Sequence, residues 1–148
     1  MANSTETKFG DPHSRVAQSE RWTVLLRPKQ PTLGSLVVVC REPVHAFADI
    51  SVEGFAELRG VVRRVEAMLH EVVAYERINW LMLMMVDPDV HWHVVPRHAG
   101  VRRVAGAELA DAGWPGPPAL DAAVSLDAAA GDALLASLRV AWSRHAGV

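Results

Sequence analysis

The sequence predicts an α+β domain with a mainly antiparallel sheet, and three observations support this prediction. Two short aliphatic segments, 22–27 and 35–41, are separated by a stretch that contains two prolines and a glycine. The apolar residues of 51–72 then follow a helical period. A second pair of apolar segments, 78–86 and 89–95, flanks a proline-containing turn. Strands before and after one long helix, joined by hairpin-like connections, are typical of this fold class.

The long helix is predicted from the spacing of its apolar side chains. Ser51 can cap its N-terminus, because a serine hydroxyl accepts a hydrogen bond from a free backbone N–H at a helix start. Apolar residues then recur at steps of three and four and share one face: Phe55, Leu58, Val62, Val65, Leu69 and Val72. The opposite face carries charges, which we expect to lie in solvent.

We expect residues 78–95 to form an antiparallel hairpin that turns at 87–89. The turn contains a proline between two aspartates, which favours a tight bend because proline presets φ and aspartate can bond its own backbone. Pro96 is expected to end the second strand, since proline lacks the N–H that a central strand needs.

The chain divides by composition into three parts. Residues 1–19 are polar and have no apolar period, so we expect a flexible N-terminal arm. Residues 20–106 contain the predicted sheet and helix. Residues 107–148 are rich in alanine, glycine and proline and are predicted to form a C-terminal extension that packs on the same domain. In this extension Asp127 can cap a last helix that carries Leu134, Leu135, Leu138 and Trp142.

Composition limits the partners of the protein. Lysine and arginine number 15 against 17 acidic residues, and this balance gives no basic field for a nucleic-acid polymer. The longest apolar run, 80–86, is far shorter than the roughly 18 residues that indicate a membrane span. The single cysteine, Cys40, lies in an apolar run and is expected in the core. Because the N-terminus lacks the apolar stretch of a secretory signal, we expect a cytoplasmic protein.

The chemistry of the sequence is concentrated in 89–97. Alternate side chains of a strand share a face, so Asp89, His91 and His93 are predicted to point away from the core and the residues between them toward it. Three interpretations stay open: the histidines do nothing, they bind a metal, or one of them is a nucleophile at phosphorus. A metal needs a third ligand, and none of His45, His70 and His98 has a recognisable spacing. Imidazole suits the nucleophile because it is substantially neutral near pH 7 and leaves as readily as it attacks.

The segment Asp89-Val-His-Trp-His-Val-Val-Pro-Arg97 resembles the signature of the histidine-triad family, in which three histidines alternate with apolar residues. Upstream, 31–39 is similar to the family's segment of proline, glycine and an aliphatic strand, and 49–51 to the loop that opens its helix. The resemblance covers roughly residues 22–98. It implies an antiparallel sheet of about five strands with the helix packed on it, and homodimers that join two sheets.

The resemblance also implies a reaction. His91 matches the family's nucleophile, which attacks the α-phosphate of a nucleoside phosphoramidate or a dinucleoside polyphosphate, and water then hydrolyses the nucleotidyl-histidine. His93 matches a histidine that contacts the phosphate. Asn79 matches a region of polar nucleotide contacts, although a strand-start asparagine also bonds backbone. Arg97 is a candidate for the phosphate or for a structural ion pair. No metal or other cofactor is expected.

Two departures from the family pattern concern the site. Asp89 stands where the family has its first histidine, and this position makes it a candidate substrate contact beside Asn79 and Arg97. A carboxylate near a phosphate repels it unless it is protonated or points away. The Gly-rich stretch that often precedes the triad is replaced by the apolar run 80–86. Arg27 and Lys29 are candidates for a cationic rim, or else are solvated charges. The sequence therefore predicts a nucleotide hydrolase or transferase, with a non-catalytic nucleotide-binding or regulatory module of the same fold as the alternative.

Overall fold

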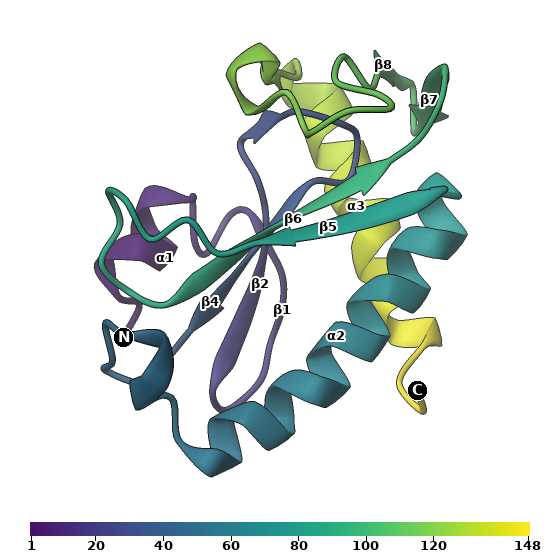
Figure 1. Cartoon of the computed structure of the whole chain (residues 1–148). Helices are drawn as coiled ribbons and strands as arrows, with labels where there is room; N and C mark the ends of the chain where they lie inside the picture. Colours follow the sequence, from purple (N-terminus) through teal and green to yellow (C-terminus); the bar gives the residue numbers. More distant parts are fainter.

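A computed structural model describes all residues, 1–148, and contains a five-stranded antiparallel sheet (Figure 1). In spatial order its strands are β1 (Arg15–Gln18), β2 (Trp22–Leu26), β4 (Leu36–Cys40), β6 (His91–Arg97) and β5 (Arg77–Leu81). All four neighbouring pairs run antiparallel. The predicted α+β class and sheet are confirmed.

Helices α2 (Val52–Val73) and α3 (Ala128–Arg144) cover one face of this sheet and contact each other. The serine cap predicted for α2 is present, since Ser51 Oγ accepts from the N–H of Gly54 at 2.9 Å. Asp127 caps α3 in the same way through the N–H of Ala130. Both caps satisfy backbone donors that have no partner within the helix.

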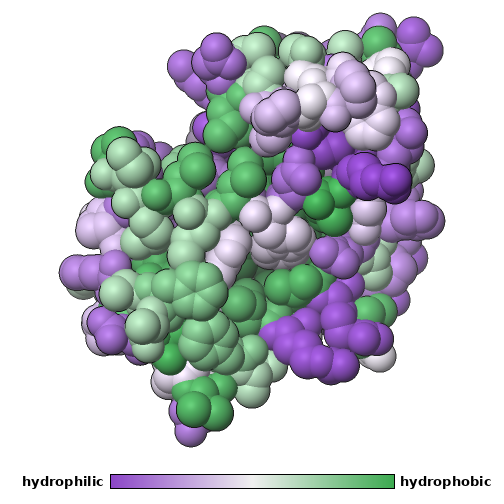
Figure 2. All heavy atoms as spheres, in the orientation of Figure 1, coloured by the Kyte–Doolittle hydropathy of each residue, from purple (hydrophilic) through white to green (hydrophobic).

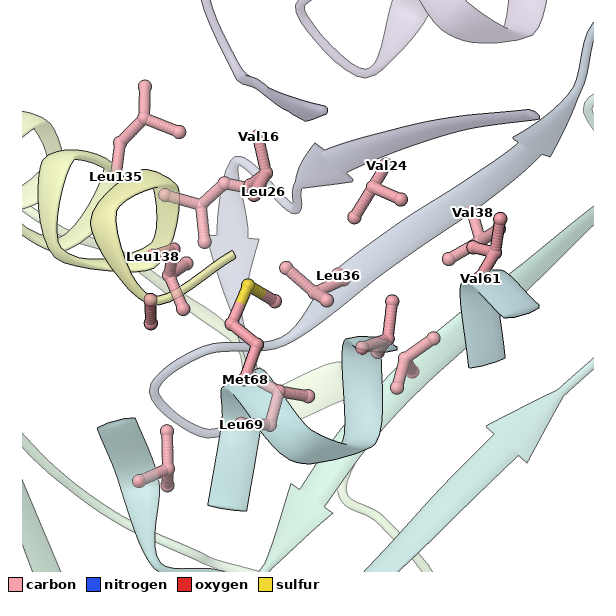
Figure 3. Packing of buried hydrophobic residues seen from close by; sticks show 14 of the residues in the cluster. Val16, Val24, Leu26, Leu36, Val38, Val61, Met68, Leu69, Leu135 and Leu138 are labelled. Atoms are coloured by element: carbon pink, nitrogen blue, oxygen red, sulfur yellow. The ribbon is translucent and has the colours of Figure 1, made fainter. Parts of the chain in front are cut away.

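The main core lies between the two helices and the sheet. Figure 3 shows Met68 and Leu69 of α2 and Leu138 of α3 directed toward Leu36 of β4. The buried face of α2 is rotated from the predicted one, because Val65 and Leu69 are buried but Phe55 is 40% exposed. Glycine, methionine and neighbouring valines complete the buried face: Gly54, Val61, Met68 and Val73.

Short elements complete the fold. They are α1 (Ser4–Lys8), β3 (Lys29–Gln30) paired with β9 (Val124–Ser125), the hairpin of β7 (Val101–Val104) and β8 (Ala107–Ala110), and the single 3₁₀ turns η1 (Phe47–Asp49) and η2 (Leu120–Ala122). None of the helices has both the length and the apolar character needed to cross a membrane.

Two details of the predicted hairpin are corrected. Strands β5 and β6 do pair antiparallel, but β5 ends at Leu81 and residues 82–90 form an irregular connection in place of a tight turn. Met84 within it has a φ of 51°, which is incompatible with a continuing strand. Pro96 lies inside β6, paired with Ile78. It is tolerated because the pairing of β6 with β4 ends at Val94, so that one side of β6 is free of a strand there.

Residues 1–19 also differ from the expected flexible arm, because they include α1 and the edge strand β1. The side chains of this segment are polar, so no apolar pattern predicted its order. They are hydrogen-bonded inside the protein. Glu6, only 1% exposed, accepts from Thr23 Oγ1 at 2.6 Å and from the backbone N–H of Asn3 at 3.0 Å. An internal hydrogen bond removes the cost of burying a polar group.

Candidate functional site

The two histidines lie on the sheet face opposite α2 and α3. Their strand partners in β4 are Val39 for His91 and Val37 for His93. The side chains on the other face of β6 point into the core as predicted, with Val94 wholly buried and Trp92 packed against it. The alternation expected for 89–95 therefore holds in the strand, and it places both imidazoles on one surface.

Phe9, which follows α1, covers both histidines. Its ring centroid lies 6.1 Å from that of His91 and 5.7 Å from that of His93. The two imidazole centroids are 5.2 Å apart and their planes are nearly perpendicular, at 79°. His91 is 2% exposed and His93 is 7% exposed. The histidines are thus a close pair beneath a segment that the sequence did not connect with the site.

A hydrogen bond fixes the tautomer of His91. Its Nδ1 lies 2.7 Å from the backbone oxygen of Asp89. Because a carbonyl oxygen can only accept, Nδ1 carries the proton, and in the neutral ring the lone pair is therefore on Nε2. The ring has the form required of a nucleophile that attacks through Nε2.

His93 is held neutral by its surroundings. Burial lowers its pKa to about 4, and the nearby charges of His91 and Arg27 act in the same direction. Its Nδ1 is buried and has no hydrogen-bond partner in the protein. Buried polar atoms without a partner are uncommon in proteins.

A cavity of about 290 Å³ opens beside the two histidines. Besides them it is lined by cationic, apolar and acidic side chains from three segments: Lys8, Phe9, Arg27, Leu83, Met85, Val86 and Asp87. Lys8 also forms an ion pair with Asp87 at 2.7 Å. A neighbouring cavity of about 260 Å³ shares Lys8, Phe9 and Arg27 and adds Lys29. Of the two cations predicted for a rim, Arg27 therefore lines the histidine cavity and Lys29 lines the neighbouring cavity. Lys8 is a further cation at the site that the sequence did not predict.

Asp89 does not line this cavity. The residue is 5% exposed, and its carboxylate is turned to α1, where Oδ2 accepts from the backbone N–H of Thr5 at 3.1 Å and from Thr5 Oγ1 at 2.8 Å. Ser4 Oγ donates to the same oxygen at 3.3 Å. Oδ1 lies 3.5 Å from Nε2 of His45. The repulsion expected between Asp89 and a phosphate is reduced, because the charge points away from the cavity.

Arg97 and Asn79, the other predicted substrate contacts, are not brought to the histidine cavity. Arg97 Nε donates to Asp111 Oδ2 at 2.7 Å, and its Nη1 donates to Asn79 Oδ1 at 2.8 Å. Burial opposes ionisation of Asp111, but the bonds from Arg97 outweigh it and lower the pKa of that carboxyl. Both residues border a different cavity of about 340 Å³, beside the segment 114–118.

The Arg97–Asp111 pair should be a structural anchor of the C-terminal extension. Asp111→Ala leaves a buried guanidinium without its counter-ion, so we expect a loss of about 3–5 kcal/mol in unfolding free energy. Urea denaturation measures this change. The matched control is Glu108→Ala, which breaks the exposed pair with Arg103 and should change stability little. Equal effects of the two variants would contradict the anchor.

Stability should also depend on pH through His93. Its folded pKa of about 4 is below the unfolded value of about 6.5, so the unfolded chain takes up the proton first as the pH falls. The contribution is fully present above pH 6.5 and is lost toward pH 4, by about 1.4 kcal/mol for each unit of pKa difference. His93→Asn should flatten the pH dependence of unfolding in this window. His98, whose pKa burial also lowers, leaves a residual slope. Identical slopes for wild type and variant would refute the assignment.

Histidine-triad proteins of known structure share this fold. A histidine triad protein from Bradyrhizobium japonicum superimposes with a TM-score of 0.74 at 20% identity, over 95% of this chain and 96% of that chain. One from Sinorhizobium meliloti gives 0.73 at 18% identity, over 93% of each chain. A hypothetical histidine triad nucleotide-binding protein from Sulfolobus tokodaii gives 0.71 at 16% identity, over 88% of this chain and 84% of that one. No protein-family model and no curated protein sequence matches the chain.

Proposed function

We propose that the chain is a member of the histidine-triad family and a nucleotide hydrolase or nucleotidyl transferase whose nucleophile is His91. The observation that carries this proposal is the bond from His91 Nδ1–H to the Asp89 carbonyl, 2.7 Å long, in a ring that lines a cavity with two cationic side chains. The fold shared with histidine-triad proteins supports it. The substrates that fit are nucleoside phosphoramidates and dinucleoside polyphosphates, because both present an α-phosphate with a good leaving group.

The reaction has two displacements at phosphorus. The lone pair on His91 Nε2 attacks the α-phosphorus, a P–N bond forms, and the bond to the leaving group breaks. The leaving group departs with the electron pair of that bond and takes up a proton from solvent. The Asp89 carbonyl accepts a hydrogen bond from Nδ1–H and so stabilises the positive charge that the ring acquires. Water, or another acceptor in a transferase, then attacks phosphorus and loses its proton to solvent, while the P–N bond breaks and its electron pair returns to Nε2. Each bond that forms is matched by one that breaks.

Other groups at the cavity have roles that follow from their charge. His93 is neutral and lines the cavity, where its ring can donate a hydrogen bond to a phosphate oxygen or to the leaving group. The cations Lys8 and Arg27 offset the charge that builds on phosphate oxygens. Asn79 and Arg97 are assigned a structural role, since Arg97 donates to Asn79 and also to Asp111 and Gly116.

A non-catalytic nucleotide-binding or regulatory module is the second candidate. It is favoured by the slight exposure of His91, 2%, which leaves little room for an attack without movement of Phe9. The two candidates share nucleotide binding and differ in turnover. A wild type that binds AMP but cleaves neither adenosine 5′-phosphoramidate nor a diadenosine polyphosphate would favour the module.

Removal of the nucleophile tests the enzymatic proposal. His91→Ala should lower kcat by about 10³-fold or more while AMP still binds, because the covalent route is lost and most contacts remain. His93→Ala should lower kcat by about 10²- to 10³-fold, the usual effect of one lost stabilising donor. Initial rates with the phosphoramidate measure both. A rate unchanged in His91→Ala would exclude this residue as the nucleophile.

We also propose a homodimer formed through β5. This strand is at one edge of the sheet, where unpaired backbone groups favour pairing with a second copy. Figure 2, in the orientation of Figure 1, shows apolar residues gathered on the visible surface near the 82–90 connection and the start of α2. Exposed apolar residues of these segments and of η1 include Phe47, Val52, Phe55, Leu83, Met85 and Val86.

Light scattering checks the assembly. We expect a mass near twice the 16.1 kDa of one chain at micromolar concentration. A charge at the apolar surface, Phe55→Glu, should shift the mass toward the monomer because a desolvated charge opposes association. A wild-type mass near 16.1 kDa would contradict the dimer.

A further inference from the structure

We propose that Asp89 is a positioning residue, whose carboxylate holds residues 3–9 against the sheet and thereby sets Lys8 and Phe9 at the mouth of the histidine cavity. Its effect on ligand binding rests on the proposed function, whereas the docking of residues 3–9 is a property of the free protein. The residue that replaces the first histidine of the triad signature then has a role of its own.

Asp89 and Thr5 satisfy each other's polar groups in a buried contact. Asp89 Oδ2 accepts from the N–H and the hydroxyl of Thr5, and the N–H of Asp89 donates back to Thr5 Oγ1 at 3.2 Å. Thr5 is fully buried and Asp89 is 5% exposed. Loss of either partner leaves buried groups unsatisfied, which costs more than a bond at the surface. The contact therefore fixes residue 5 strongly.

The side chain at position 89 has to accept several hydrogen bonds. A single oxygen of Asp89 receives three donors, the N–H and hydroxyl of Thr5 and the hydroxyl of Ser4. A neutral imidazole has one acceptor nitrogen with one lone pair, and a charged imidazolium has none. Histidine at this position is unable to make this set of bonds, so the departure from the signature and the docking of α1 are chemically linked.

Helix α1 depends on such anchors because it has only five residues. A helix this short is unstable by itself, since nucleation fixes several residues for few bonds. Besides Asp89, the sheet anchors it through Thr23 Oγ1, which donates to Glu6, and through the Cys40 carbonyl, which accepts from Asn3 Nδ2 at 3.0 Å. Figure 1 shows α1 beside the 82–90 connection, away from α2 and α3.

The end of α1 leads directly into the site. Lys8 is its last residue and Phe9 is its C-cap, so both are displaced if the helix undocks. Lys8 is one of two cations that line the cavity, and Phe9 packs on both imidazoles. Asp89 itself is not among the lining residues. Its action on a ligand is therefore indirect and runs through Thr5, Lys8 and Phe9.

A double-mutant cycle between Asp89 and Thr5 tests the proposal. The variants are Asp89→Ala, Thr5→Val and the double variant, and the probe is AMP, measured by calorimetry. Each single variant should weaken AMP binding by about tenfold, as expected when one charge-assisted contact is lost. The double variant should be no weaker than the worse single variant, because both remove the same contact. Additive losses would show that Asp89 acts independently of Thr5, and would overturn the proposal.

Conservative variants and hydrogen exchange complete the test. Asp89→Asn and Thr5→Ser keep acceptor and donor and should recover most of the affinity, whereas Lys8→Ala should weaken AMP binding without undocking α1. In the ligand-free protein, Asp89→Ala should remove the exchange protection of the Thr7 and Phe9 amides, which bond within the docked segment. Unchanged protection would overturn the docking role. If protection is lost but the wild type does not bind AMP, the docking role stands and the proposed function fails.

Discussion

Strand β6 (His91–Arg97) is hydrogen-bonded between β4 and β5, and this pairing determines which of its side chains meet the core and which meet the cavity. Val94 packs under the helices while His91 and His93 lie on the other face. A slip of one residue would exchange the two sets and bury imidazoles in the apolar core. The apolar core therefore fixes the register, and the register fixes the geometry of the site. Both the tautomer of His91 and the low pKa of His93 depend on it.

The periodic spacing of apolar residues and the helix-capping residues made much of the fold predictable from the sequence. Ser51 and Asp127 cap the helices expected of them, and the strands on either side of α2 fall close to the predicted segments. Apolar periodicity did not predict the course of 82–90, because Met84 takes a left-handed conformation that sequence spacing does not encode. The face of α2 was only partly predicted. A periodic pattern indicates a stripe, but the neighbours of the helix decide which part of that stripe is covered.

The part of the candidate site that lies on one strand was predictable. The part formed by residues far apart in the sequence was less predictable. His91 and His93 share a face because they alternate in sequence. Asp89 meets Thr5 across 84 positions, and no local pattern signals that contact. Lys8 and Phe9 lie in a polar segment that looked disordered, since its order comes from buried hydrogen bonds rather than from apolar residues. Arg97 pairs with the buried Asp111 at 2.7 Å and does not line the histidine cavity.

Covalent chemistry at His91 is the central claim, and an adduct tests it most directly. The wild-type protein is mixed with adenosine 5′-phosphoramidate and denatured in alkali within one turnover, because phosphorus–nitrogen bonds to histidine survive base. The masses of its peptides are then measured by mass spectrometry. We expect an adenylyl group on the peptide that contains His91, and none in His91→Ala. Turnover by wild type with the adenylyl group on a different residue, or with full activity retained in His91→Ala, would contradict it.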